Sequence, residues 1–226
     1  MKAYPQTIHF VGLNAPIGAE YDLTDLSVEG VIPGDVDGVF FRAVPDPAHP
    51  PKFDDDNLLS HDGMISAVRI QGGKASTSMR YVKTARYLAE QEKGMARFGR
   101  YRNVFTDDDD VKGVDRTVAN TTPVWHAGRL LMTKEDGRPY RIDPKTLETL
   151  GSYDFGGKLK SETVTAHVRV DPGTGELFFF GYEADGPAST KIAYMIADKD
   201  GNLAKEQWFD APYCAMMHDF TITENY

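Results

Sequence analysis

The sequence is poor in cysteine: Cys214 is the only one among 226 residues, so no disulfide can form within the chain. Long apolar runs are also missing, because no window approaches the 18 consecutive apolar residues of a transmembrane helix. The N-terminal segment lacks the apolar run and the small-residue cleavage site of a signal peptide. From these absences we expect a protein of the reducing cytoplasm with no membrane partner.

Basic residues are outnumbered, since 25 Lys and Arg stand against 34 Asp and Glu and give a net charge of −9. We therefore expect no nucleic-acid partner, because binding to a phosphate backbone requires a basic face. The HExxH, CxxC and GxSxG signatures are absent, and no GxGxxG follows a predicted strand, so a hydrolase or a dinucleotide-binding protein has no support. The 41% apolar content is that of an ordinary globular domain with a core.

Strand and turn signals run through most of the chain. Residues 65–70 and 75–82 flank Gly72-Gly73 and predict a hairpin. Apolar residues recur at helical spacing only in a short segment near 85–99. Further strands are predicted at 38–44, 129–133, 138–142, 147–154, 167–170, 176–182 and 193–197. Antiparallel strands in such regular succession fit a sandwich, a barrel, a jelly roll or a propeller.

Two histidines lie at the edges of predicted strands. His167 and His218 are 51 residues apart, about the length of one four-stranded propeller blade. Equivalent positions of successive blades converge on the axis of a propeller, and two imidazoles brought together there could bind Fe, Zn or Cu. The spacing alone leaves open that each is a structural or surface histidine.

Five segments, in order along nearly the whole chain, resemble the carotenoid and stilbene cleavage dioxygenases. They are Val28–Pro33 with Asp37–Arg42, Asp62–Ile65, Arg80–Thr84, Asn120–Tyr140, and the pair Ala166-His167 and Met217–Phe220. The resemblance implies an all-β fold that is a seven-bladed β-propeller in a full-length family member. Residues 1–226 would be the N-terminal part of a single propeller domain, about its first half.

The resemblance also implies a cofactor, one Fe(II) per full-length subunit held by four histidines, with O2 as co-substrate. His167 and His218 match the first two metal ligands, and Glu135 matches a carboxylate that hydrogen-bonds a ligand histidine. The other histidines fit no ligand motif; His126 lies in a family motif but not at a ligand position, and we expect it to be structural. The sequence is therefore either a portion of a longer enzyme or a truncated chain that cannot hold iron as its relatives do.

Within the family, the sequence is most similar to the bacterial lignostilbene dioxygenases, which cleave the central double bond of phenolic stilbenes into two aromatic aldehydes. Lys134 stands just before Glu135, as in that branch, and Tyr101 matches its tyrosine. The resemblance implies that both bind the 4-hydroxyl of the stilbene and favour its phenolate, which would activate the alkene. Leu59 replaces an expected phenylalanine that contacts the substrate ring, and His61 stands where the family usually has glycine.

The same resemblance suggests a role in the catabolism of lignin-derived aromatics and a homodimer. Two other functions stay open. The first is an apocarotenoid-cleaving or other polyene-cleaving dioxygenase, which would have no phenol for Lys134 to hold. The second is a non-catalytic β-propeller that binds a partner and no longer uses its histidines, which the iron content of the longer protein would reveal.

Overall fold

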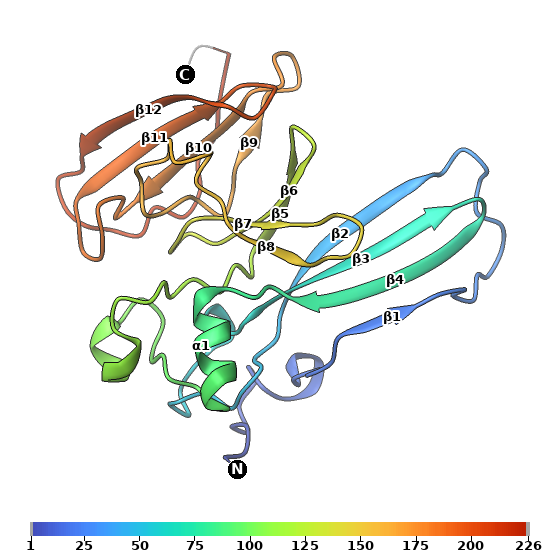
Figure 1. Ribbon diagram of the computed structural model, residues 1–226, viewed down its shortest axis with the longest axis horizontal. Helices are drawn as coiled ribbons and strands as arrows, with labels where there is room; N and C mark the ends of the chain where they lie inside the picture. The colour runs from blue at the N-terminus through green and yellow to red at the C-terminus, as the bar shows by residue number, and fades with distance from the viewer. Residues whose placement is uncertain (1, 225–226) are drawn as a thin grey trace.

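The computed structural model describes residues 2–224, which form three four-stranded antiparallel sheets (Figure 1). Sheet A contains β1 (Tyr21–Leu23), β2 (Gly38–Pro45), β3 (Gly63–Gln71) and β4 (Lys74–Tyr81), in the spatial order β1-β4-β3-β2. Sheet B contains β5 (Thr122–His126), β6 (Arg129–Thr133), β7 (Tyr140–Ile142) and β8 (Thr149–Ser152) in sequence order. Sheet C contains β9 (Arg169–Val170), β10 (Leu177–Tyr182), β11 (Lys191–Ala197) and β12 (Leu203–Asp210), also in sequence order. Four strands that follow one another in this way form the unit of a propeller blade.

The all-β prediction is confirmed, and so is the predicted hairpin of sheet A. Strands β3 and β4 pair up to Gln71 and Lys74, which leaves Gly72 and Gly73 as a two-residue turn. Both glycines have positive φ angles, 59° and 74°, which this tight turn requires and other residues rarely adopt. Strands β1, β5 and β12 were not predicted. The strand expected directly after His218 was wrong, because residues 219–224 form no strand.

The only α-helix of the described residues, α1 (Ala85–Lys93), is shorter than the predicted segment near 85–99. It begins after Thr84, whose side chain accepts a hydrogen bond from the Tyr87 N–H, and it ends at Gly94 in the left-handed conformation. Beyond Gly94 the chain turns back, because the buried Glu90 carboxylate accepts hydrogen bonds from the next backbone amides, those of Arg97 and Phe98. The extension to residue 99 was therefore wrong. The remaining helical turns are short 3-10 segments, η1 (Gly12–Asn14), η2 (Leu58–Ser60), η3 (Val104–Thr106) and η4 (Asp109–Val111).

Strand β6 lies between two hydrophobic cores and contributes to both. Leu130 and Met132 belong to the cluster that packs sheet A against sheet B, whereas Leu131 belongs to the cluster that packs sheet B against sheet C. Successive side chains of a strand point to opposite faces, so a continuous apolar run is what a strand buried on both faces requires. Lys134 and Glu135 follow directly after this strand, so its packing fixes the position of their backbone.

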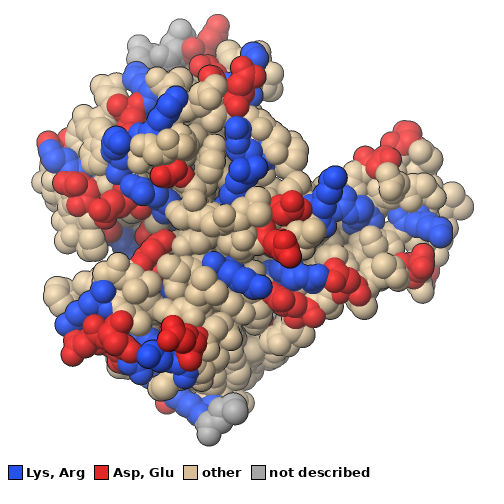
Figure 2. All heavy atoms as spheres, in the orientation of Figure 1, with Lys and Arg blue, Asp and Glu red and all other residues tan. Residues whose placement is uncertain are grey.

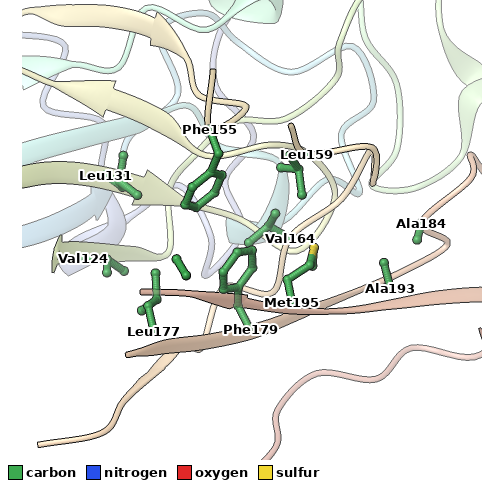
Figure 3. Packing of buried hydrophobic residues seen from close by; sticks show 11 residues of the cluster. Val124, Leu131, Phe155, Leu159, Val164, Leu177, Phe179, Ala184, Ala193 and Met195 are labelled. Carbon is green, nitrogen blue, oxygen red and sulfur yellow. The ribbon is translucent and has the colours of Figure 1, made fainter. Parts of the chain in front are cut away.

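The core between sheets B and C anchors the segment that leads to His167. Phe155 from this connection stacks on Phe179 of β10, with ring centroids 5.4 Å apart and an interplanar angle of 12° (Figure 3). Leu159 and Val164 of the same connection are also buried in this cluster. The loop before His167 is thus held by apolar packing along its length, which limits the freedom of the histidine backbone.

Replacement of Phe179 by alanine is expected to lower the free energy of unfolding of the intact protein by about 3–5 kcal/mol, the usual cost of removing a fully buried aromatic ring. Phe105, whose side chain is 95% exposed, offers a matched control, and its replacement by alanine should change stability by less than about 0.5 kcal/mol. Denaturant titration of both variants tests this. Equal effects of the two substitutions would show that this cluster does not stabilise the fold.

The surface carries charges of both signs. On the face drawn in Figure 2, Lys and Arg side chains are interspersed with Asp and Glu, and no large area has one sign. Among residues 2–224 no helix is long and apolar enough to cross a bilayer.

Candidate metal and substrate site

The structure brings His167 and His218 together. His167 lies two residues before β9 and His218 eight residues after β12, so the whole of sheet C separates them in sequence. Their Nε2 atoms are nevertheless 3.0 Å apart, and the two rings meet edge to face with centroids 4.6 Å apart. The predicted convergence of positions one blade apart is therefore observed.

The backbone around the two histidines is tied together by side chains of both segments. The Thr165 hydroxyl accepts a hydrogen bond from the His167 N–H at 3.1 Å and donates to the His218 carbonyl at 3.5 Å. Arg169 and Asp219, the second residue after His167 and the first after His218, form an ion pair at 2.6 Å. These contacts hold the two imidazoles in one relative position.

Glu135 is buried and uses its two carboxylate oxygens on two different side chains. Oε2 lies 2.7 Å from Nδ1 of His218, and Oε1 accepts a hydrogen bond of 2.9 Å from the Tyr101 hydroxyl. A carboxylate at Nδ1 keeps the proton on that nitrogen, which leaves the lone pair of a neutral imidazole on Nε2. His218 is thus in the form that binds a metal ion.

The histidine pair fits a transition metal. Two nitrogens bound at about 2.1 Å and at right angles to one ion lie about 3 Å apart, which matches the observed 3.0 Å between the Nε2 atoms. Neutral imidazole nitrogen suits iron, zinc and copper, and a carboxylate behind the ring is the usual support of such a ligand. Residues 2–224 hold no group of three or more potential ligands, so the chain offers two ligands, and any others would come from outside it.

Lys134 lies in an unusual environment for a lysine. Its side chain is only 3% exposed, and its ammonium sits 4.7 Å from the centroid of the Tyr101 ring. Within residues 2–224 this ammonium has no hydrogen bond and no ion pair. Burial lowers the pKa of Lys134, and the charges of Asp136 and Glu135 oppose this shift. The site therefore contains a buried cationic group that lacks an anionic partner in contact.

Tyr101 keeps its proton in this environment. Burial, followed by the charges of Asp136 and Glu135, raises the pKa of Tyr101 well above its usual range. Its hydroxyl donates to Glu135, which the sequence did not predict, and its oxygen retains lone pairs that can accept a further hydrogen bond. A neutral phenol presented to this site can donate to that oxygen.

Arg102, the residue after Tyr101, ties this segment of the chain to Tyr182 and Glu183, contacts that the sequence analysis missed. Its guanidinium donates to the Tyr182 hydroxyl at 2.8 Å, stacks over that ring at 4.7 Å and pairs with Glu183. On the other side of Tyr101, the Arg100 guanidinium binds Asp55 through both of its oxygens. In the sequence, Tyr101 simply stands between two arginines, and this local pattern does not reveal which distant residues the arginines contact.

The other predicted positions lie away from these contacts. Leu59 is on the η2 turn with its side chain 46% exposed, and among residues 2–224 no ring contact or hydrogen bond joins it to Tyr101 or Lys134; its contact with a substrate stays a prediction. His126 is buried, with Nε2 3.0 Å from the Gly175 carbonyl oxygen, which agrees with the structural role expected of it.

His61 belongs to a second buried polar cluster, separate from the histidine pair. Its side chain is 2% exposed, neither ring nitrogen has a partner within the described chain, and its ring packs on Phe10 at 4.7 Å. Burial, with smaller contributions from His9 and Arg86, lowers the pKa of His61 to about 4. The neighbouring Asp62 is also buried, which raises its pKa to about 6. His61 is therefore neutral in the folded protein at neutral pH.

The lowered pKa of His61 predicts a loss of stability in acid. Between pH 6.5 and 4 the unfolded chain holds a proton on His61 that the folded chain does not, so the free energy of unfolding falls as the pH falls through this window. At the acidic end of this window, the titration of His61 lowers the free energy of unfolding by about 3 kcal/mol. Denaturant titrations of wild type and His61→Phe across these pH values should show a shallower decline in the variant.

Asp62 titrates in the same window with the opposite sign, because its folded-state pKa is raised. It is present in both proteins, so its contribution cancels in the comparison. Identical pH slopes for wild type and His61→Phe would contradict the assignment of a neutral buried His61.

Comparison with known proteins places the chain in a family. Residues 14–226 match the family model described as retinal pigment epithelial membrane protein, RPE65. Resveratrol cleavage oxygenase 1 of Chaetomium globosum is 47% identical over 226 residues, which cover 99% of this chain and 38% of that protein. Isoeugenol monooxygenase of Pseudomonas nitroreducens is 48% identical over 217 residues, which cover 96% of this chain and 45% of that protein.

A solved structure gives the same result for the fold. The crystal structure of Pseudomonas brassicacearum lignostilbene dioxygenase matches with a TM-score of 0.95 and 43% identity, over 99% of this chain and 47% of that one. The predicted propeller fold is thereby confirmed. The prediction of seven blades applies to a full-length family member. The chain spans less than half the length of the relatives it matches. The chain belongs to the retinal pigment epithelial membrane protein family and is similar over nearly its whole length to a lignostilbene dioxygenase.

Proposed function

We propose that the protein containing this chain is a non-haem iron dioxygenase that cleaves the alkene of phenolic stilbenes and releases two aromatic aldehydes. The observation that carries the proposal is Lys134, a buried ammonium without a partner in contact, placed beside Tyr101 and thereby next to the Glu135–His218 pair. Resveratrol and the lignostilbenes, in the names of the relatives, share a phenol conjugated to an alkene. A phenol is the group that such an ammonium would select.

Lys134 and Tyr101 would act on the phenol of the substrate. A cation buried without a counter-charge is costly, so a phenolate that binds beside Lys134 is stabilised more than it would be in water. Tyr101, whose own proton is donated to Glu135, offers a lone pair of its hydroxyl oxygen to the phenol while that group is still protonated. The charge of Lys134 favours release of the phenol proton to solvent, and the resulting phenolate pushes electron density through the ring into the alkene and prepares it for oxidation.

His167 and His218 would hold the iron, whose contribution is to bind O2 and activate it toward the alkene. Glu135 keeps the Nε2 lone pair of His218 available by accepting the Nδ1 proton in a hydrogen bond. The chain's own contribution is placement: the phenol site and the histidine pair are connected through one buried carboxylate, so a bound substrate has a fixed relation to both.

A second candidate substrate is a propenylphenol such as isoeugenol. The isoeugenol monooxygenase of Pseudomonas nitroreducens is as similar to this chain as the resveratrol-cleaving relative, and its substrate carries the same phenol on a shorter alkene. Lys134 serves both substrates equally well. A polyene substrate would offer the buried Lys134 ammonium no hydrogen-bond acceptor and no anionic partner in contact, so we favour a phenolic substrate over a polyene.

The remaining expectations accompany this proposal. We propose that residues 1–226 form the N-terminal part of one propeller domain in the longer protein. A cytoplasmic location, a homodimer and a place in the catabolism of lignin-derived aromatics also stay predictions.

The full-length protein, loaded with Fe(II) without oxygen and then exposed to air, tests the proposal. A 4-hydroxystilbene, isoeugenol and an apocarotenoid are offered separately, and aldehyde products are quantified by chromatography. We expect cleavage of the stilbene and of isoeugenol, which both carry the phenol, and none of the apocarotenoid. Cleavage of the apocarotenoid alone would overturn the phenolic assignment, and a full-length protein that binds no iron would favour the binding module.

A further inference from the structure

The Glu135 carboxylate contacts two side chains to which the proposed function gives different tasks. Tyr101 belongs to the phenol site, and His218 is a metal ligand. We propose that Tyr101 is also a positioning residue for His218, acting through Glu135, so that a residue of the phenol site helps to set the affinity and ligand field of the metal. This inference rests on the metal site of the proposed function and adds a residue to it.

The first argument is the number of hydrogen bonds that the carboxylate can make. Glu135 is 4% exposed, and its partners within residues 2–224 are the Tyr101 hydroxyl at Oε1 and the His218 imidazole at Oε2. A buried carboxylate is costly without donors. The Tyr101 hydroxyl therefore satisfies one of the two oxygens and fixes the rotation of the carboxylate about its last bond, which aims the other oxygen at Nδ1.

The second argument is the competing partner. Lys134 precedes Glu135 in sequence, and among residues 2–224 its ammonium forms no ion pair, with Glu135 or with any other carboxylate. Without the Tyr101 hydroxyl, Oε1 would have no donor, and the nearby ammonium would attract the carboxylate away from His218. The hydroxyl thus holds Glu135 on the histidine and keeps Lys134 free for the substrate.

The third argument is that Tyr101 is itself rigid. The Arg102 guanidinium bonds Tyr182 and Glu183, and Arg100 bonds Asp55, so the residues on both sides of Tyr101 are tied to other parts of the fold. A mobile hydroxyl could not orient a carboxylate. A fixed one can, and the chain Tyr101–Glu135–His218 then forms one connected unit.

Binding of Co²⁺ to the full-length protein, in the absence of substrate, tests the proposal. Tyr101→Phe removes the hydroxyl and keeps the ring over Lys134. We expect Co²⁺ to bind about 10- to 100-fold more weakly, the usual effect of removing an outer partner of a ligand histidine, with a change in its visible absorption spectrum. Tyr140→Phe is the matched control, because the buried Tyr140 hydroxyl bonds the Asp115 carboxylate and the Ala85 N–H, away from Glu135.

A double variant separates positioning from general disturbance. In a Glu135→Leu background the side chain can bond neither Tyr101 nor His218, so the path from the hydroxyl to His218 is already broken. Adding Tyr101→Phe there should cost no further affinity for Co²⁺. Thermal unfolding midpoints establish that each variant is folded. Wild-type affinity and spectrum in Tyr101→Phe would overturn the proposal, as would a full effect of Tyr101→Phe in the Glu135→Leu background.

The two proposals can fail separately. Unchanged Co²⁺ binding in Tyr101→Phe, together with stilbene cleavage by the wild type, removes the positioning role alone. The expected loss of Co²⁺ affinity without cleavage of any stilbene removes the substrate assignment and keeps the positioning role.

Discussion

Replacement of Lys134 by methionine is expected to lower kcat/KM for a 4-hydroxystilbene at least about 100-fold, equivalent to about 2.7 kcal/mol of transition-state stabilisation. Methionine approximates the length and volume of the lysine stem, so the packing around Tyr101 is retained while the charge is lost. The ammonium is buried and unpaired, which makes it the strongest electrostatic partner available to a phenolate at this position. Steady-state kinetics of the iron-loaded full-length protein measures the effect.

The control for Lys134→Met is Lys199→Met. Lys199 is exposed, and its ammonium pairs with the neighbouring Asp200, so its loss should leave kcat/KM unchanged. A substrate control is equally direct: a 4-methoxystilbene, if cleaved at all, should be cleaved equally by wild type and Lys134→Met, because it has no proton to lose. A Lys134→Met variant that retains wild-type kinetics on the 4-hydroxystilbene would remove Lys134 from the mechanism.

Replacement of His218 by alanine is expected to abolish stoichiometric iron binding and reduce stilbene cleavage below detection. His218 is the histidine whose Nδ1 is fixed by Glu135 and whose Nε2 meets that of His167. Its side chain is 57% exposed in this chain, so alanine leaves no cavity in a core and the fold should survive. Elemental analysis of the purified full-length variant, with a parallel activity assay, measures both effects.

The control for His218→Ala is His126→Gln. His126 is a buried histidine bonded to the Gly175 carbonyl, and the glutamine amide can donate the same hydrogen bond. This variant should retain iron and activity. Retention of iron by His218→Ala would show that the histidine pair is not the metal site.

Local patterns in the sequence predict much of the fold. Turn residues and apolar runs locate β6, β10 and β11, whose side chains are largely buried. Strand β12 was missed because its residues, LAKEQWFD, are mostly exposed and carry little apolar signal. Strand β5 was missed because Pro123 weakens a strand pattern.

The site was predictable only in part. His167 and His218 are separated by about the length of one blade. Together with the family resemblance, this spacing was enough to predict that the two side chains lie close together. The contact between Glu135 and His218, 83 residues apart, was expected from the family resemblance alone. The hydrogen bond from Tyr101 to Glu135, 34 residues apart, was not expected, and no periodic pattern encodes either distance. The same is true of Arg102, whose partners are Tyr182, the last residue of β10, and Glu183, which follows it. These contacts follow from how the blades pack, which only the structure supplies.

The central claim is that the buried Lys134 selects a phenol and promotes its ionisation. Aldehyde formation by the iron-loaded full-length protein in air, measured in parallel on a 4-hydroxystilbene and its 4-methoxy analogue, tests this most directly. We predict aldehydes from the phenol and little or none from the ether, because the methyl ether cannot form a phenolate. Equal cleavage of the two would contradict the role given to Lys134, even though the protein would still be a stilbene-cleaving dioxygenase.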